Sequence, residues 1–124
     1  MEPTERALVQ AAGAVARLRC RGAAHTVAAA VLGPDGRVFT GVNLRYPVGE
    51  TCAEVVALGA AATQGVRDPV AIVAVGDGGR TVFPPCGRCR AVLREHAPSI
   101  TVIIGPLDAL RALPLTDLPP EPPA

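Results

Sequence analysis

The chain of 124 residues contains no lysine, so all twelve of its basic residues are arginine. Without an amine side chain it can form no lysine Schiff base, and it lacks the lysine of a P-loop. Tryptophan is also absent, and the aromatic side chains are limited to Phe39, Tyr46 and Phe83. This excludes the rows of aromatic stacking platforms that single-strand nucleic-acid binders use.

The chain also lacks a strong excess of charge and a long apolar run. Twelve basic and eleven acidic residues leave a net charge of +1, which creates no large field for attracting phosphates or an anionic membrane. No apolar run reaches the roughly 20 residues that span a bilayer, and the acidic start at Glu2 and Glu5 is unlike a signal peptide. We therefore expect a cytoplasmic protein with no nucleic-acid or membrane partner.

A chain of this length predicts one domain, and 49% hydrophobic residues predict a well-buried one. Helical spacing of apolar residues predicts a first helix over residues 4–19, with Thr4 as its N-cap. Two apolar runs near residues 26–32 and 37–43 flank the turn cluster Gly33–Gly36, which indicates a β-hairpin.

Proline, glycine and continuous apolar runs predict the remaining elements. These elements are a loop over residues 44–51, a helix over 52–64 ending at Gly65, a central strand over 69–76, a helix over 86–96, a strand over 99–105 and a short helix over 107–113. The alternation indicates an α/β domain over residues 1–113, followed by a Pro-rich tail over residues 114–124.

Three of the four cysteines have a spacing that suits a metal ion. Cys52 and Cys86 each fall at the start of a predicted helix, where the helix dipole favours the thiolate. Cys89 follows Cys86 by three residues and lies on the same helix face. Together they can supply three tetrahedral corners and leave the fourth for water, which is the arrangement of a catalytic zinc site.

Two other uses of the cysteines stay open. Cys86 and Cys89 alone form a C-x-x-C pair, which is also typical of thiol redox proteins. A closed site with four cysteines would need Cys20, which has no partner at short spacing and is more simply a small apolar residue.

Glu54 follows Cys52 by two residues. In the first turn of a helix its carboxylate can reach the water of a metal held by Cys52, where an unligated glutamate can move protons. The simpler interpretation is that an acidic residue in a first turn stabilises the helix dipole.

The motif CAE at residues 52–54, followed by PCGRC at residues 85–89, resembles the signature of the zinc nucleoside and nucleobase deaminases. With cysteine as the first ligand, the chain resembles the cytidine deaminase family, and from His25 to about Leu93 its pattern is closest to the blasticidin S deaminases. The family's sugar-binding glutamate has no match, because Arg45 occupies its place.

The resemblance implies a cytidine deaminase-like fold, a three-layer α/β/α arrangement with a mixed sheet, and a homotetramer. It implies Cys52, Cys86 and Cys89 as Zn²⁺ ligands and Glu54 as the proton shuttle. The substrate contacts that it implies are Asn43 on the sugar, together with Thr26, Ala53 and Pro85.

Three thiolates on Zn²⁺ give the site a net charge of −1, which would make the bound water less acidic unless a donor offsets it. Arg88, between two of the ligands, is the candidate for this offset. His25, at the start of the first strand, is a candidate for an edge contact to the substrate.

The function implied is hydrolytic deamination of a 4-aminopyrimidine nucleoside, as in pyrimidine salvage, with release of ammonia. A non-catalytic binding module stabilised by zinc stays open as the alternative. Such a module would need the cysteines but would not need Glu54.

Overall fold

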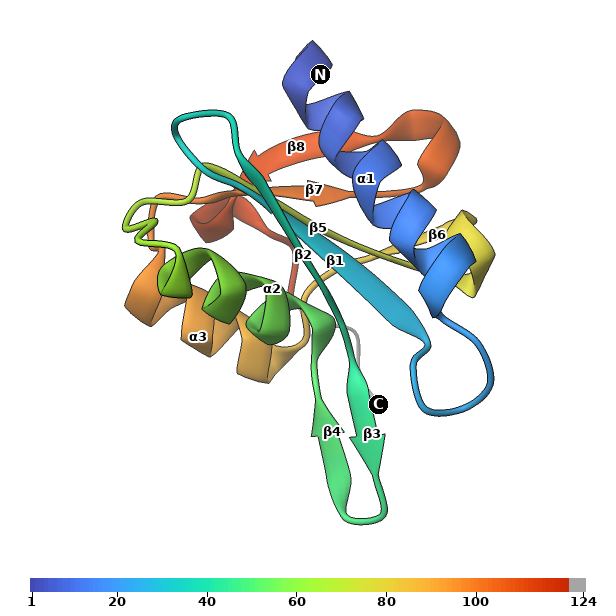
Figure 1. Ribbon diagram of the computed structural model, residues 1–124. Coiled ribbons are helices and arrows are strands. Elements are labelled where there is room, and N and C mark those ends of the chain that lie inside the picture. The colour runs from blue at the N-terminus through green and yellow to red at the C-terminus, as the bar shows by residue number, and fades with distance from the viewer. Residues whose placement is uncertain (121–124) are drawn as a thin grey trace.

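The computed structural model describes residues 1–120 and is built around one mixed β-sheet (Figure 1). Its strands lie in the order β2-β1-β5-β7-β8, and β6 also pairs with β5. Their bounds are β1 Val27–Leu32, β2 Val38–Val42, β5 Ala71–Gly76, β6 Thr81–Phe83, β7 Thr101–Ile104 and β8 Arg111–Pro114. The β5–β7 pair is parallel, and β5 is buried at all six positions, so the predicted central strand is confirmed.

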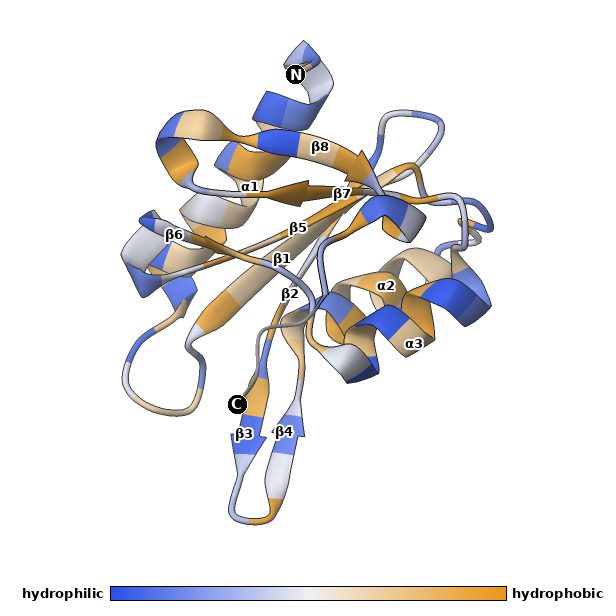
Figure 2. Cartoon of the chain, turned by 180° about the vertical axis from the view of Figure 1, so that it is seen from behind, coloured by the Kyte–Doolittle hydropathy of each residue, from blue (hydrophilic) through white to orange (hydrophobic). Residues whose placement is uncertain are grey.

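Helices cover both faces of the sheet. Helix α1 (Pro3–Arg19) packs on one face, and α2 (Ala53–Thr63) and α3 (Gly87–His96) pack on the other (Figure 1). A hydrophobic core lies on each face of the sheet, and alternate residues of β1 pack into one or the other. Ala28 packs on the side of α1 and Ala29 on the side of α2. In Figure 2 the strands between the helices are largely apolar. The three-layer α/β/α fold is therefore confirmed.

Close contact between β2 and α2 fixes where the second helix lies. A Cβ on Gly41 of β2 would lie 2.7 Å from the backbone nitrogen of Ala57 and 2.8 Å from a methyl carbon of Val56. Only glycine leaves enough room for this approach, because a side chain would push α2 away from the sheet. At the far end of α2, Gly65 adopts φ +85°, as expected just after a helix.

The start of the first helix differs from the prediction. Its N-cap is Glu2 rather than Thr4, and Pro3 opens the helix. The backbone N–H of Glu2 donates a 2.9 Å hydrogen bond to the Glu5 carboxylate, which is one half of a capping box. Proline at the first helical position moves the helix start forward, because its fixed φ suits that position.

The predicted loop over residues 44–51 is wrong, because this segment forms a second hairpin. Strands β3 (Leu44–Tyr46) and β4 (Gly49–Thr51) pair antiparallel around the turn at Pro47 and Val48. This hairpin projects from the body of the molecule at the bottom of Figure 1. Proline at a turn is compatible with strands on either side of it, so it did not indicate a loop.

The predicted helix over residues 107–113 is also wrong. A short 3-10 helix over Leu107–Ala109 leads into β8, which pairs antiparallel with β7. Pairing with a neighbouring strand overrides the local helical preference here. Strand β6 was not predicted, since its three residues are too few to show a period.

Leu115 lies within the predicted Pro-rich tail and is buried against the core on the side of α2 and α3. Residues 121–124 lie outside the described part of the chain, so the division into a domain over residues 1–113 and a tail over residues 114–124 stays a prediction. Within residues 1–120, every helix is too short or too polar to cross a membrane.

Candidate metal centre and adjoining polar network

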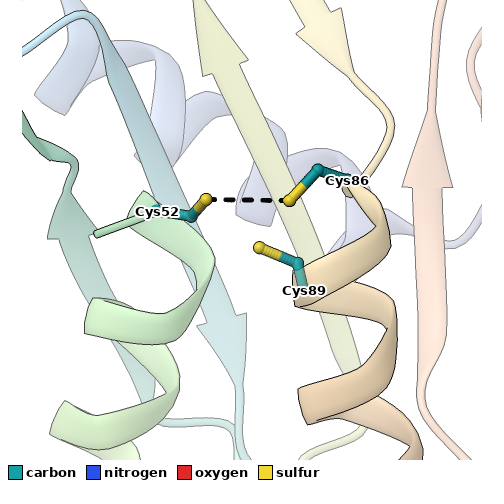
Figure 3. A group of neighbouring side chains, drawn as sticks. All are labelled: Cys52, Cys86 and Cys89. Carbon is teal, nitrogen blue, oxygen red and sulfur yellow. Dashed lines mark hydrogen bonds between the residues drawn. The ribbon is translucent and has the colours of Figure 1, made fainter. Parts of the chain in front are cut away.

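Three cysteines from two neighbouring helix starts converge on one point (Figure 3). Cys52 is the N-cap of α2 and Cys86 is the N-cap of α3, and both have the extended backbone typical of that position. Cys89 lies in the first turn of α3. The three sulfur atoms lie within 4.8 Å of one another, and those of Cys52 and Cys86 are 3.7 Å apart.

This geometry fits a zinc ion. Zinc–sulfur bonds of about 2.3 Å at tetrahedral angles place two ligand sulfurs roughly 3.8 Å apart. The Cys52–Cys86 separation of 3.7 Å matches this value. Within residues 1–120 no other set of three His, Cys, Asp or Glu side chains converges in this way. Cys20 is not part of the group and packs instead with the core beside α1, so a closed site of four cysteines is excluded.

The thiols differ in how easily they ionise. Burial acts to raise the pKa of Cys86, but hydrogen bonds, foremost from the backbone N–H of Cys89, outweigh it and lower the pKa. Burial raises the pKa of Cys52 and of Cys89. The prediction that a helix start lowers the thiol pKa is therefore confirmed for Cys86 and is wrong for Cys52. Zinc must displace protons from at least the thiols of Cys52 and Cys89.

Glu54 lies beside the cysteines in the first turn of α2. It is only 8% exposed, and within residues 1–120 it has no arginine as an ion-pair partner. Burial raises its pKa, and the nearby Glu50 carboxylate raises it further. Glu54 lines a small pocket together with Phe83 and Pro85. A carboxyl group with a raised pKa is suited to taking up and releasing a proton.

Two further predicted contact residues lie next to the metal ligands. Ala53 is 1% exposed and directly follows Cys52, and Pro85 is buried and directly precedes Cys86. Arg90 donates a 2.9 Å hydrogen bond to the Pro85 carbonyl and a 2.6 Å bond to the Pro119 carbonyl. Arg90 therefore ties the loop before Cys86 to the C-terminal segment.

Arg88 is exposed on α3, and within residues 1–120 its guanidinium forms no hydrogen bond to a cysteine sulfur. Its proposed role in offsetting the charge of the thiolates stays a prediction.

Asn43 lies at the junction between β2 and the projecting hairpin and is completely buried. Its carbonyl oxygen accepts hydrogen bonds from the backbone N–H of Thr26 at 2.7 Å and of Val27 at 2.9 Å. Its amide nitrogen donates to the Thr26 hydroxyl at 2.8 Å and to the Glu50 carboxylate at 2.7 Å. The side chain of Asn43 therefore connects three separate segments.

His25 also belongs to this network, since its Nδ1 lies 2.8 Å from the backbone carbonyl of Asn43. A carbonyl only accepts, so Nδ1 carries the hydrogen in this contact. The predicted candidates His25, Thr26 and Asn43 are thus brought together. Glu50 was missed by the sequence reasoning. The sequence carried one signal for Glu50. It lies two residues before Cys52 in extended backbone, which puts the side chains of Glu50 and Cys52 on the same face.

The site can be compared with known proteins. Residues 1–105 match the family model described as the cytidine and deoxycytidylate deaminase zinc-binding region, a span that includes all three cysteines and Glu54. The chain is 47% identical over 79 residues to a cytidine deaminase of Halalkalibacterium halodurans, an alignment covering 62% of this chain and 59% of that protein. It is 34% identical over 89 residues to a blasticidin-S deaminase of Bacillus cereus, with 64% of each chain covered.

Among solved structures, cytidine deaminase from Mycobacterium leprae superposes with a TM-score of 0.77 and 30% identity, covering 97% of this chain and all of that one. The alignments to the Halalkalibacterium and Bacillus proteins span less than two thirds of either relative. The fold, the zinc-binding region and the convergent cysteines agree, so the metal of this centre is Zn²⁺.

Proposed function

Because the chain belongs to the cytidine and deoxycytidylate deaminase zinc-binding family, we propose that it is a hydrolytic deaminase. It converts a cytidine-type nucleoside to the uridine-type product and releases ammonia. The observation that carries this proposal is the position of the buried Glu54 beside three convergent thiols. A site built only to hold zinc for stability has no use for a carboxyl group placed there.

Cys52, Cys86 and Cys89 hold the zinc ion. When bound, zinc lowers the pKa of a water molecule to about 7 and so supplies a nucleophile at neutral pH.

Glu54 moves the protons of the reaction. Its carboxylate takes a proton from the attacking water and delivers it to N3 of the pyrimidine ring, which makes C4 more electrophilic. It then takes the remaining proton from the hydroxyl group added at C4 and passes it to the exocyclic amine, which leaves as ammonia while the C4 carbonyl forms. Burial raises the pKa of Glu54, which makes its protonated form easier to reach than that of an exposed carboxyl group.

The residues next to the metal ligands position the ring. Ala53 and Pro85, both buried against the ligands, bring backbone groups to the substrate. The Thr26 hydroxyl contacts the sugar side.

Arg88 offsets the charge of the thiolates, and we expect Arg88→Gln to keep zinc and to shift the pH profile of kcat. An unchanged profile would reject this role.

A homotetramer in the cytoplasm is the remaining part of the proposal. Leu44, Tyr46 and Val48 are exposed on the projecting hairpin, and Val48 is 93% exposed. Apolar side chains on a protruding segment favour contact with another copy of the chain. Sedimentation equilibrium tests the tetramer, and a monomer at micromolar concentration would reject it. Fractionation of cells that express the chain tests its location.

An ultraviolet deamination assay on protein of measured zinc content tests the activity. The substrates are cytidine, deoxycytidine, cytosine, 5-methylcytidine and blasticidin S, with Glu54→Gln as the control. We expect turnover of at least one nucleoside, lost in the variant. No turnover of any substrate with a full zinc complement would overturn the proposal in favour of the binding module.

A further inference from the structure

We infer that Arg90 is a positioning residue of the metal centre. It holds the two peptide groups on either side of Cys86, and it makes the placement of that ligand depend on the C-terminal segment, residues 115–120. The inference needs the zinc centre but not the deaminase activity, so it goes beyond the proposed function.

The link between β6 and α3 has few hydrogen-bond donors of its own. Strand β6 ends at Phe83, which pairs with Ala74, and Cys86 is the N-cap of α3. The two residues between them, Pro84 and Pro85, have no backbone N–H to donate. Because Pro85 is buried, its carbonyl group needs a donor from elsewhere in the chain.

Arg90 supplies that donor and holds Cys86 from both sides. Its side chain points back along α3, as helical side chains do, and its Nε donates a 2.9 Å hydrogen bond to the Pro85 carbonyl. Its backbone N–H donates a 2.9 Å bond to the Cys86 carbonyl. The angles φ −70° and ψ 172° of Cys86 are the rotations between these two held peptide groups. Arg90 therefore restricts the direction in which the Cys86 side chain leaves the backbone.

The same guanidinium holds the C-terminal segment. Leu115 is buried in the core on the side of α2 and α3, and Leu118 packs against that core. The Pro119 carbonyl then accepts a 2.6 Å hydrogen bond from Nη1 of Arg90. A guanidinium is planar and rigid, so a bond to Pro119 also fixes the plane in which Nε reaches Pro85.

Apolar packing contributes little to the attachment of Pro119. This residue is exposed, and a pocket of about 440 Å³ lies beside it, with Val82, Ile104 and Arg90 among its lining residues. The attachment therefore depends on the hydrogen bond to Arg90. When that bond opens, the guanidinium loses one of its two carbonyl partners, and Cys86 loses part of its restraint.

Arg90 acts on the ligand through position and not through charge. Its Nε and Nη1 face carbonyl oxygens, and within residues 1–120 it makes no hydrogen bond to a sulfur atom. Replacing residues that orient metal ligands typically changes metal affinity about 10- to 100-fold. Loss of Arg90 is therefore expected to weaken the zinc site and to change its geometry.

Metal titration of the full chain tests the inference. Arg90→Met keeps an apolar stem and removes every side-chain donor. In this variant we expect the zinc dissociation constant, measured by competition with a chromophoric chelator, to rise about 10- to 100-fold. The visible absorption bands of bound Co²⁺, which report the geometry of its ligands, should shift as well. Arg94→Met, one turn further along α3 at an exposed position, is the matched control and should change neither quantity.

A second variant and a second measurement separate positioning from a general loss of stability. Arg90→Lys keeps a donor but not the planar fork, so we expect a smaller rise in the zinc dissociation constant. The same comparison with Arg94→Met is made on Arg90→Lys if Arg90→Met does not fold. Amide hydrogen exchange over residues 115–118, followed by mass spectrometry, should be faster in Arg90→Met than in Arg94→Met.

An unchanged zinc dissociation constant, an unchanged Co²⁺ spectrum, or equal changes in Arg94→Met would overturn the inference. A lower Tm of zinc-free Arg90→Met, with zinc affinity and hydrogen exchange as in the wild type, would show a merely structural role and reject it. None of these measurements uses a nucleoside. A chain that deaminates no substrate therefore leaves this test intact.

Discussion

The metal end of this site and its proposed sugar end, the polar network around Asn43, are built in opposite ways. At the metal end, four functional residues lie in two short motifs, each at the start of a helix that packs on the same face of the sheet. At the sugar end, Asn43 joins residues 17 positions before it and 7 positions after it in the sequence. The first end depends on local chain geometry, and the second depends on how distant segments pair.

This difference predicts how each end responds to change. A substitution at the metal end alters chemistry while the sheet and helices persist, because the ligands lie at the starts of two helices, away from the strands. A substitution at the sugar end alters stability as well, because Asn43 holds the start of β1 to the hairpin. Four experiments test this contrast.

The largest effect is expected for Glu54→Gln on turnover. Loss of the proton carrier should lower kcat about 10²- to 10⁴-fold while zinc content stays at one per chain. Absorbance at the substrate maximum and atomic emission on the same sample measure the two quantities. Turnover close to wild type would contradict the role of Glu54.

Asn43→Ala should cost about 2–4 kcal/mol of unfolding free energy, because two buried backbone N–H groups lose their acceptor. Urea denaturation measures this loss. Glu50→Gln is the control, since its amide oxygen can still accept from Asn43 and should leave stability within about 0.5 kcal/mol. If Asn43→Ala is as stable as the wild type, the contrast between the two ends is wrong.

Removal of zinc should lower Tm by about 10 °C without unfolding the chain at 25 °C. Neither of the two core clusters on either side of the sheet includes Cys52, Cys86 or Cys89, so the secondary structure should persist. Circular dichroism before and after chelation tests this. A chain that unfolds on chelation would mean that the metal end is a structural support.

The smallest effect is expected for the pH dependence of stability that Glu54 causes. Burial raises its pKa above the ordinary value of 4.5, so the folded state binds this proton more tightly than the unfolded state. Its contribution to stability is therefore lost as pH rises from about 4.5 toward neutral. In zinc-free protein we expect Glu54→Gln to melt a few degrees higher than wild type at pH 7, with the gap closing at pH 4. A lower Tm for the variant at pH 7 would contradict this.

The same contrast explains what could be predicted from the sequence. The convergence of Cys52, Cys86 and Cys89 could be predicted because a helix start places a capping residue and its first turn at known positions. The hairpin β1–β2 and the central strand β5 were predicted because apolar runs and turn residues mark them locally.

Glu50 could not be found in this way. Its position depends on the pairing of Leu44 with Thr51 across the second hairpin, and Pro47 and Gly49 concealed that pairing. For the same reason the internal partners of Asn43 became visible only in three dimensions, and its contact with the sugar stays a prediction.

The length of the turn at Pro47 and Val48 has a consequence for how such proteins diversify. In a strand, alternate side chains point to opposite faces, so a shift in register by one residue would replace Glu50 by one of its neighbours as the partner of Asn43. Insertions or deletions at this exposed turn can therefore change the network around Asn43 without touching the cysteine motifs. The hairpin and the metal centre can vary independently in this architecture.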